Sequence, residues 1–386
     1  MVERPTGAGV APAVAPVSNI VVKLTARCNL GCTYCYWFRD ASVYETPPRM
    51  TEEVEEAFLR RLEEHLARYR IATMGLGLHG GEPLLFGKRR FERLLRRLRD
   101  IEEASGTAFS LNVTTNGVLV DAEWAAMFRR YGVLVGVSID GPPAMHDSRR
   151  VDLLGRPSHV QVIEGLCHLV REGVDPGVLA VCDPLSDPAE LMTYFVDVLG
   201  LTNFDVLVPD ARHGDQPASI ARYYTGLFDL WFDHYAERGV RVRWLEAALR
   251  GLLGGWSGVD SIGYGPITII TLLTDGSIQV QDVCRIAGDG SIVSPVNVLS
   301  HPLEDIHDDP LWREVWDASI NLAEPCRDCK WLHACGGGHI ASRWSDERRF
   351  DNPSVYCEDF KTILSHYWKR VAPTLYYEPI RATPVP

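Results

Sequence analysis

Seven of the ten cysteines lie in two groups with short, irregular spacings. They are Cys28, Cys32, Cys35, Cys326, Cys329, Cys335 and Cys357. In a reducing compartment such clustering favours metal or iron–sulfur ligation over disulfide bonds. By contrast, Cys167 and Cys182 lie in apolar segments, and we predict that both are buried core thiols. The chemistry of this chain should therefore be found at the two cysteine groups.

The first group, CNLGCTYC (28–35), supplies three thiolates from one short loop. Zinc usually takes four ligands from paired units, whereas three thiolates suit a [4Fe–4S] cluster with one open iron. An open iron can chelate the amino and carboxylate groups of S-adenosylmethionine, and an electron from the reduced cluster then produces a 5′-deoxyadenosyl radical. A zinc site or a set of unrelated thiols is the alternative interpretation.

The second group has the pattern Cys326-x2-Cys329-x5-Cys335-x21-Cys357. Four thiolates are enough to saturate one auxiliary [4Fe–4S] cluster, which suits electron transfer or structural support better than substrate binding. Structural zinc also takes four thiolates and stays open as an alternative. The sequence thus predicts two clusters, one that binds S-adenosylmethionine and one that is auxiliary.

Short apolar runs alternate with amphipathic stretches from residue 19 onward. NIVVKLT (19–25) and MGLGLHG (74–80) are typical of strands, and 50–70 and 88–104 of helices, the first of them capped by Thr51. Six such repeats predict an α/β fold, a partial (β/α)6 barrel with parallel strands. The first cysteine loop, HGGEP, TTNG and SIDGP all follow predicted strands, where barrel enzymes carry their functional loops.

The C-terminal half has a different pattern. Residues 217–255 look helical, and 268–284 alternate around Asp275-Gly276, which predicts a β-hairpin before a last helix that ends near Val371. The predicted organisation is a flexible segment at 1–17, the partial barrel at 18–210, a helical bridge at 211–265, an auxiliary-cluster domain at 266–371 and a flexible tail at 372–386.

CNLGCTYCY after a first strand resembles the signature of the radical S-adenosylmethionine (SAM) superfamily, and HGGEP, TTNG and SIDGP agree in order. The resemblance implies that the glycines of HGGEP allow close backbone approach, that Glu82 meets the methionine amino group and that Arg150 pairs with its carboxylate. The cofactor-contacting residues it implies are Tyr34, Gly80, Gly81, Glu82, Asn116, Ser138, Asp140 and Arg150.

The second cysteine group resembles the C-terminal SPASM extension of peptide-modifying radical enzymes. Full SPASM domains carry two auxiliary clusters, with further cysteines beside the hairpin and one just after the CGGG stretch. Here His339 stands at the latter position and Cys284 alone remains near the hairpin. We therefore expect the first auxiliary cluster to be absent, and His339 to pack or hydrogen-bond rather than to ligate.

Within the superfamily, stretches such as LHGGEPLLFG, CGGGHIASRW and FDNPSVYCEDF resemble the FxsB-like maturases. This resemblance implies a radical SAM oxidoreductase that forms a cyclophane-type cross-link in a ribosomal precursor peptide, with a flavodoxin or ferredoxin as electron donor. Asp282, on the predicted hairpin, is a candidate catalytic base. A solvated turn acid is the alternative interpretation of that residue.

Three other functions stay open. One is a sulfatase-maturase-like dehydrogenase that forms formylglycine; that family has an aspartate directly after its hairpin cysteine, whereas Arg285 follows Cys284 here. The second is a small-molecule radical SAM dehydrogenase or epimerase. The third is a non-enzymatic iron–sulfur protein.

The composition argues against nucleic acid and membrane partners. The net charge is −12, and no basic run with interleaved aromatics occurs. Arginines in LLRRLRD (94–100) are typical of a solvated helix face. Apolar runs such as 267–273 are too short to span a bilayer, and the N-terminus does not resemble a signal peptide, so we expect a cytoplasmic protein.

Overall fold

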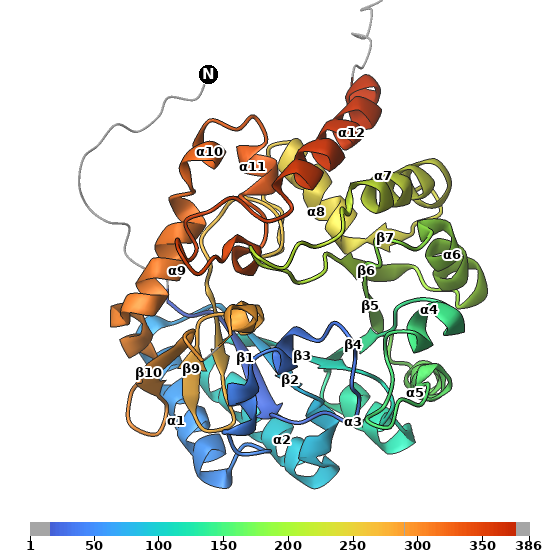
Figure 1. Ribbon diagram of the computed structural model, residues 1–386. Coiled ribbons are helices and arrows are strands. Elements are labelled where there is room, and N and C mark those ends of the chain that lie inside the picture. The colour runs from blue at the N-terminus through green and yellow to red at the C-terminus, as the bar shows by residue number, and fades with distance from the viewer. Residues whose placement is uncertain (1–15, 289, 376–386) are drawn as a thin grey trace, which may run out of the picture.

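The computed structural model describes residues 16–288 and 290–375, and within these ranges one ten-stranded sheet curves around with helices on its outside (Figure 1). The strands are β1 (Asn19–Thr25), β2 (Thr73–Gly80), β3 (Ala108–Thr115), β4 (Leu134–Ser138), β5 (Gly177–Val181), β6 (Asn203–Leu207), β7 (Arg241–Val242), β8 (Ile269–Leu272), β9 (Ser277–Gln279) and β10 (Val293–Asn297). Strands β1 to β7 follow sequence order, each parallel to the next. The predicted parallel α/β barrel is confirmed.

The helices begin where the sequence places capping residues. Thr51 and Asp121 accept hydrogen bonds from the backbone N–H groups of Val54 and Trp124, which satisfies the first turns of α1 and α3. The helices are α1 (Glu52–Tyr69), α2 (Lys88–Ser105), α3 (Ala122–Arg130), α4 (Pro143–Asp147), α5 (His159–Arg171), α6 (Pro188–Met192), α7 (Ala221–Leu230), α8 (Arg243–Leu252), α9 (Pro310–Ile320), α10 (Glu324–Arg327), α11 (Leu332–Cys335) and α12 (Cys357–Leu375).

Alternation along the strands separates a packed shell from an open interior. On β1, Ile20 and Val22 are buried in the main apolar core, whereas Asn19 and Val21 line a cavity. Asn112 on β3 lines the same cavity while its neighbour Leu111 is buried in the core. Successive side chains point to opposite faces of a strand, so the polar and small residues meet inside the barrel.

The C-terminal extension continues the same sheet. Strand β8 pairs in parallel with β1, and β8 and β9 form the predicted hairpin around Asp275 and Gly276. Gly276 has φ +87°, a conformation that glycine adopts without strain. The hairpin leads directly to Asp282 and Cys284, which therefore lie beside the first strand of the barrel.

Some expectations about chain ends and thiols are wrong. Helix α12 runs to Leu375 instead of ending near Val371, and Val17, assigned to a flexible segment, is buried. The rest of the two predicted flexible segments, 1–15 and 376–386, lies outside the described residues. Cys182 is buried as predicted, but Cys167 is exposed on α5. In the described part of the chain, no helix is long and apolar enough to cross a membrane.

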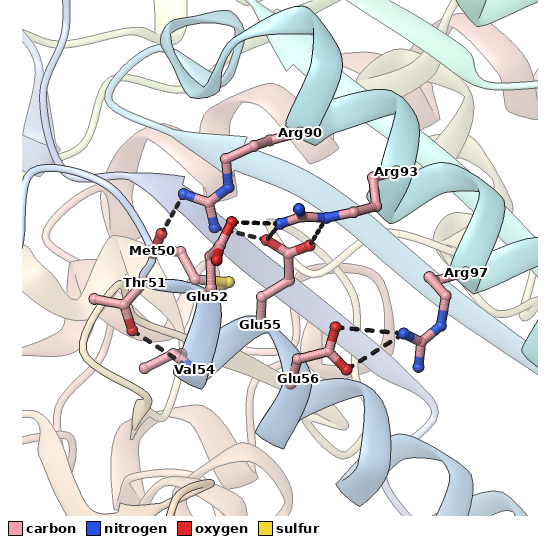
Figure 2. A network of polar contacts seen from close by, with 9 residues as sticks. All are labelled: Met50, Thr51, Glu52, Val54, Glu55, Glu56, Arg90, Arg93 and Arg97. Atoms are coloured by element: carbon pink, nitrogen blue, oxygen red, sulfur yellow. Dashed lines mark hydrogen bonds and ion pairs between the residues drawn. The ribbon is translucent and has the colours of Figure 1, made fainter.

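An ion-pair network joins α1 to α2 (Figure 2). Glu55 is 1% exposed, and its carboxylate lies 2.6 Å from Arg90 Nη2 and 3.3 Å from Arg93 Nε. Arg97 lies 3.3 Å from Glu56, a pair open to solvent. The arginine-rich face of α2 is therefore partnered by α1, not only solvated as its charge pattern indicated.

Glu55→Gln should lower the free energy of unfolding by about 1–3 kcal/mol, because Arg90 and Arg93 lose a buried, charged acceptor. Denaturant unfolding of the full chain measures the change. The matched control is Glu56→Gln, whose parent side chain is 56% exposed. We expect the control to cost less than about 1 kcal/mol. Equal losses in the two variants would contradict a special role for the buried carboxylate.

Candidate active site

A cavity of about 630 Å³ lies inside the barrel, at the carboxyl ends of the strands. Its volume falls within the range of small-molecule sites, roughly 300–1,000 Å³. The sequence-predicted residues that line it are Cys28, Cys32, Cys35, Tyr34, Gly81, Asn116, Ser138, Arg150 and Asp282. Residues brought together from β1, β2, β3, β4 and the C-terminal hairpin thus share one space.

The glycines of HGGEP hold the first cysteine loop in place. A Cβ atom on Gly80 would lie 2.5 Å from Thr25 Oγ1, and one on Gly81 would lie 2.4 Å from the carbonyl oxygen of Arg27. The backbone N–H of Gly81 donates to the carbonyl of Thr25 at 3.0 Å. Gly80 is thus a packing residue, whereas Gly81 also reaches the cavity.

The three thiols of this loop suit a positively charged ligand. Burial raises the pKa of each of them, that of Cys28 to about 12. Thiolates therefore form here only when a cation compensates the charge, as a bound metal does. The backbone N–H of Leu30 already points at Cys28 Sγ, at 3.4 Å. The three thiols come from one loop and all line the cavity, an arrangement that fits the expected iron–sulfur cluster with one open iron.

Glu82 does not face the cavity. Its buried carboxylate accepts hydrogen bonds from the Thr115 hydroxyl at 2.7 Å and from the backbone N–H groups of Asn116 and Leu84 at 2.8 and 3.0 Å. Burial raises its pKa to about 7, against these hydrogen bonds. The side chain thus ties the end of β2 to TTNG, where Asn116 lines the cavity.

Arg150 reaches the cavity from a buried position. Its Nε lies 3.0 Å from Asp140 Oδ2, and the Tyr34 hydroxyl donates to the same carboxylate at 2.5 Å. Although burial alone opposes the charge, Asp140 raises the pKa of Arg150 above its usual value. Asp140 does not line the cavity and acts as a support for Arg150 and Tyr34. A fixed guanidinium of this kind suits a carboxylate ligand.

The second cysteine group also comes together. Cys326, Cys329, Cys335 and Cys357, from α10, α11 and the start of α12, line one small cavity of about 30 Å³. The CGGG turn beside it has three successive positive φ angles, and a Cβ on Gly336 would lie 1.9 Å from a backbone oxygen of Gly263. Four unpaired thiols around one small space fit an auxiliary cluster.

The expected base, Asp282, is held by an ion pair. Lys23 Nζ lies 2.6 Å from Asp282 Oδ2, and the Tyr36 hydroxyl donates to the same oxygen at 2.6 Å. Against the effect of burial, Lys23 holds the pKa of Asp282 well below its usual value. Arg285, the residue after Cys284, is buried and pairs with Asp40 at 3.2 Å. It supports the loop after the first cysteines.

Sequence reasoning missed several polar residues of the cavity. Asp210 and Gln281 line it, and Lys23 and His79 lie at its wall. Asp210 follows β6 by three positions, the same strand-end placement that pointed to the other motifs. A lysine inside a β1 strand pattern carries no comparable signal, because its partner is 259 residues away.

Comparison with known proteins agrees with this geometry. Residues 22–184 match the model of the radical SAM superfamily. A cysteine-type anaerobic sulfatase-maturating enzyme of Clostridium perfringens is 24% identical over 92% of this chain and 97% of its own length. A serine-type enzyme of Bacteroides thetaiotaomicron is 33% identical, over 49% of this chain and 45% of its own.

Solved structures show the same fold. A structure of anSMEcpe with bound AdoMet superposes with a TM-score of 0.80 at 23% identity, over 92% of this chain and 94% of that one. A second, with bound AdoMet and a Kp18Cys peptide, gives 0.79 at 22% identity, over 92% and 98%.

These comparisons correct the expected function. A cyclophane-forming FxsB-like maturase is not supported, and the cross-linking function is contradicted by the match to sulfatase-maturating enzymes over 92% of the chain. The arginine after Cys284 counted against a sulfatase-maturase-like function in the sequence interpretation. In the structure Arg285 forms a buried ion pair with Asp40. The match of residues 22–184 to the radical SAM superfamily agrees with the expected S-adenosylmethionine and its [4Fe–4S] cluster, and the similar solved structure is described with bound AdoMet.

The cysteine loop, the strand-end motifs around the cavity and the family match lead to one conclusion: this chain carries a radical SAM domain over residues 22–184, in a fold shared with the anaerobic sulfatase-maturating enzymes.

Proposed function

We propose that this protein oxidises a cysteine or serine side chain of a peptide to formylglycine, as a sulfatase-maturating radical SAM enzyme. The observation that carries the proposal is similarity along nearly the whole length of the cysteine-type relative, which includes the C-terminal extension. The match to the radical SAM superfamily covers residues 22–184 and by itself supports radical chemistry alone. Because cysteine-type and serine-type relatives both match, both side chains are candidate substrates.

The residues divide into those that hold cofactors and those that shape the space. Cys28, Cys32 and Cys35 would hold the reactive cluster, and the four C-terminal cysteines the auxiliary one. When bound, these cofactors supply a 5′-deoxyadenosyl radical and an acceptor for one electron. Arg150 would bind the methionine carboxylate. An external donor such as a flavodoxin or ferredoxin would provide the reducing electron.

A peptide suits the cavity for two reasons. Residues of the segment 256–269 line the cavity, and two of them carry exposed aromatic rings, Trp256 at 76% and Tyr264 at 38% exposure. Exposed aromatic rings bind extended chains through large contact areas at low entropic cost. In addition, a solved relative of the same fold is described with a bound peptide. We therefore propose that a peptide segment enters past these two rings.

Anaerobically reconstituted protein should contain about eight irons per chain, the content of two cubane clusters. Replacing Cys28, Cys32 and Cys35 with alanine should leave about four irons and abolish cleavage of S-adenosylmethionine. Iron, sulfide and zinc analysis measures this. Zinc bound at the four C-terminal cysteines would contradict the auxiliary cluster.

The wild-type protein should convert synthetic sulfatase-motif peptides that carry cysteine or serine at the target position. A serine peptide should lose two hydrogens, and in a cysteine peptide the –CH2–SH group should become –CHO, with oxygen in place of sulfur. Mass spectrometry, with hydrazide capture of the aldehyde, measures both products after incubation with S-adenosylmethionine and dithionite. An alanine peptide is the matched control. Cleavage of S-adenosylmethionine without conversion of either peptide would overturn the proposal.

Arg150→Ala should weaken S-adenosylmethionine binding by roughly tenfold or more, because a charge-assisted hydrogen bond to a carboxylate is worth about 1.5–3 kcal/mol. Equilibrium dialysis of the reconstituted protein measures the affinity, and iron content should stay unchanged because no thiolate is altered. Arg156→Ala is the control, since Arg156 is 71% exposed and pairs with Asp152. Wild-type affinity in the Arg150 variant would exclude this residue from the binding site.

A further inference from the structure

A second polar cluster lies in the cavity, apart from the Lys23–Asp282 pair. Asp210 follows β6, lines the cavity, and its Oδ1 lies 3.8 Å from His339 Nδ1. The other imidazole nitrogen, Nε2, lies 3.3 Å from Gln281 Nε2 and 3.9 Å from Asp260 Oδ2. Segments distant in sequence thus bring a carboxylate, an imidazole and an amide together at the cavity wall, where Asp210 and Gln281 line the space and His339 lies behind them.

The hydrogen bonds of this cluster set the orientation of the imidazole. The Gln281 amide nitrogen donates to Asp260, and it also faces His339 Nε2. When Nε2 accepts from the amide, the ring proton lies on Nδ1, the nitrogen that faces Asp210. In that tautomer the Nδ1–H group of His339 faces the Asp210 carboxylate at 3.8 Å.

Gln281 provides an independent indication of a ligand. It is 2% exposed, lines the cavity, and its Oε1 has no hydrogen-bond partner among the described residues. Buried acceptors are rarely left unpaired. A donor group of a bound molecule, such as a peptide N–H, would satisfy this oxygen next to the Asp210–His339 pair.

The two carboxylates of the cavity differ in their readiness to take a proton. Asp282 is neutralised by Lys23 at 2.6 Å, which holds its pKa well below the usual range, although burial opposes this. Burial raises the pKa of Asp210 to about 6, with His339 opposing the shift. General bases work best when their pKa lies near the working pH. Asp210 is therefore the better acceptor.

We infer that Asp210, positioned by His339, is the proton acceptor in the oxidation of the peptide side chain. The inference rests on the proposed formylglycine-forming function. Its residues lie after β6 and after the CGGG turn, and neither belongs to the hairpin whose aspartate the sequence suggested.

The step balances as follows. A –CH2–XH side chain, with X as sulfur or oxygen, loses a Cβ hydrogen atom to the 5′-deoxyadenosyl radical, and 5′-deoxyadenosine forms. The X–H proton passes to the Asp210 carboxylate, one electron passes to an iron–sulfur cluster, and a C=X double bond forms. With X as oxygen the product is formylglycine. With X as sulfur, water then replaces sulfur and hydrogen sulfide leaves.

Asp210→Asn should lower peptide conversion by roughly 100-fold or more, the usual effect of removing a general base. Formation of 5′-deoxyadenosine and iron content should persist, which shows that the variant is folded and loaded. Asp210→Glu should restore part of the conversion. Asp197→Asn is the control, because Asp197 is 41% exposed, pairs with Arg238 and does not line the cavity. We expect that control to stay within a few-fold of wild type, as for removal of a group outside the proton transfer.

The acid limb of the pH profile separates a chemical role from a structural one. Conversion should fall as Asp210 becomes protonated, with a midpoint near its pKa of about 6. His339→Gln should move the limb to higher pH, because His339 lowers the pKa of Asp210 and the variant loses that effect. The charged and titratable groups that act on Asp210 or feel its charge are Arg39, Tyr36, Asp260, Asp282, Cys284, His339 and Tyr356.

A readout without turnover comes from infrared titration of the reconstituted protein. The difference between wild type and Asp210→Asn should contain one carboxyl band that titrates near pH 6. Conversion by wild type together with equal conversion by Asp210→Asn would overturn this inference alone. Loss of conversion in Asp282→Asn, with Asp210→Asn active, would assign the proton to the hairpin aspartate. Absence of conversion by wild type would remove the proposed function and this role with it.

Discussion

The ion pair between Lys23 and Asp282 holds the two halves of the molecule in register. Lys23 is fully buried on β1, and its ammonium lies 4.2 Å from the ring centre of Trp37, just after the first cysteines. Asp282 comes from the C-terminal hairpin, and Tyr36 donates to it. A buried charge without its partner costs several kcal/mol, so the strand, the cysteine loop and the extension must assemble together.

The carboxylates in and around the cavity are in different chemical states. Asp140 forms an ion pair with Arg150, and Asp282 forms one with Lys23. Glu82 accepts hydrogen bonds from backbone and hydroxyl donors. The Asp210 carboxylate lies 3.8 Å from an imidazole, a longer contact than those of the other three carboxylates. Different environments give neighbouring carboxylates different pKa values. Some of them can then stay ionised as structural partners while another accepts a proton. The first three groups position cofactor-binding and packing elements, which leaves Asp210 for chemistry.

The sequence predicted those parts of the site that depend on residues close together in the chain. The cysteine spacing, the strand-end motifs and the Asp275-Gly276 turn all depend on residues close together in the chain, and each has the expected place. Residues whose meaning depends on a distant partner escaped prediction, such as Lys23. Arg285 was misjudged for the same reason, because its partner, Asp40, lies 245 residues away. The choice between cross-linking and formylglycine formation also depended on comparison over the full length.

Arg343 connects the CGGG turn to the route that an electron would take. It is 4% exposed and donates to the carbonyl oxygens of Gly336, Gly337 and Gly338, which fixes the turn beside the four cysteines. Burial lowers its pKa to about 10, so it stays charged at neutral pH. The charge of Arg343 lowers the pKa of Cys335 and of Cys326, although burial raises both. A buried cation favours added negative charge nearby, and therefore favours acceptance of an electron at the C-terminal cysteine site. The segment 339–343 would then serve both transfers. At one end His339 lies next to the proton acceptor, Asp210, and at the other end Arg343 would stabilise an electron acceptor at the C-terminal cysteines.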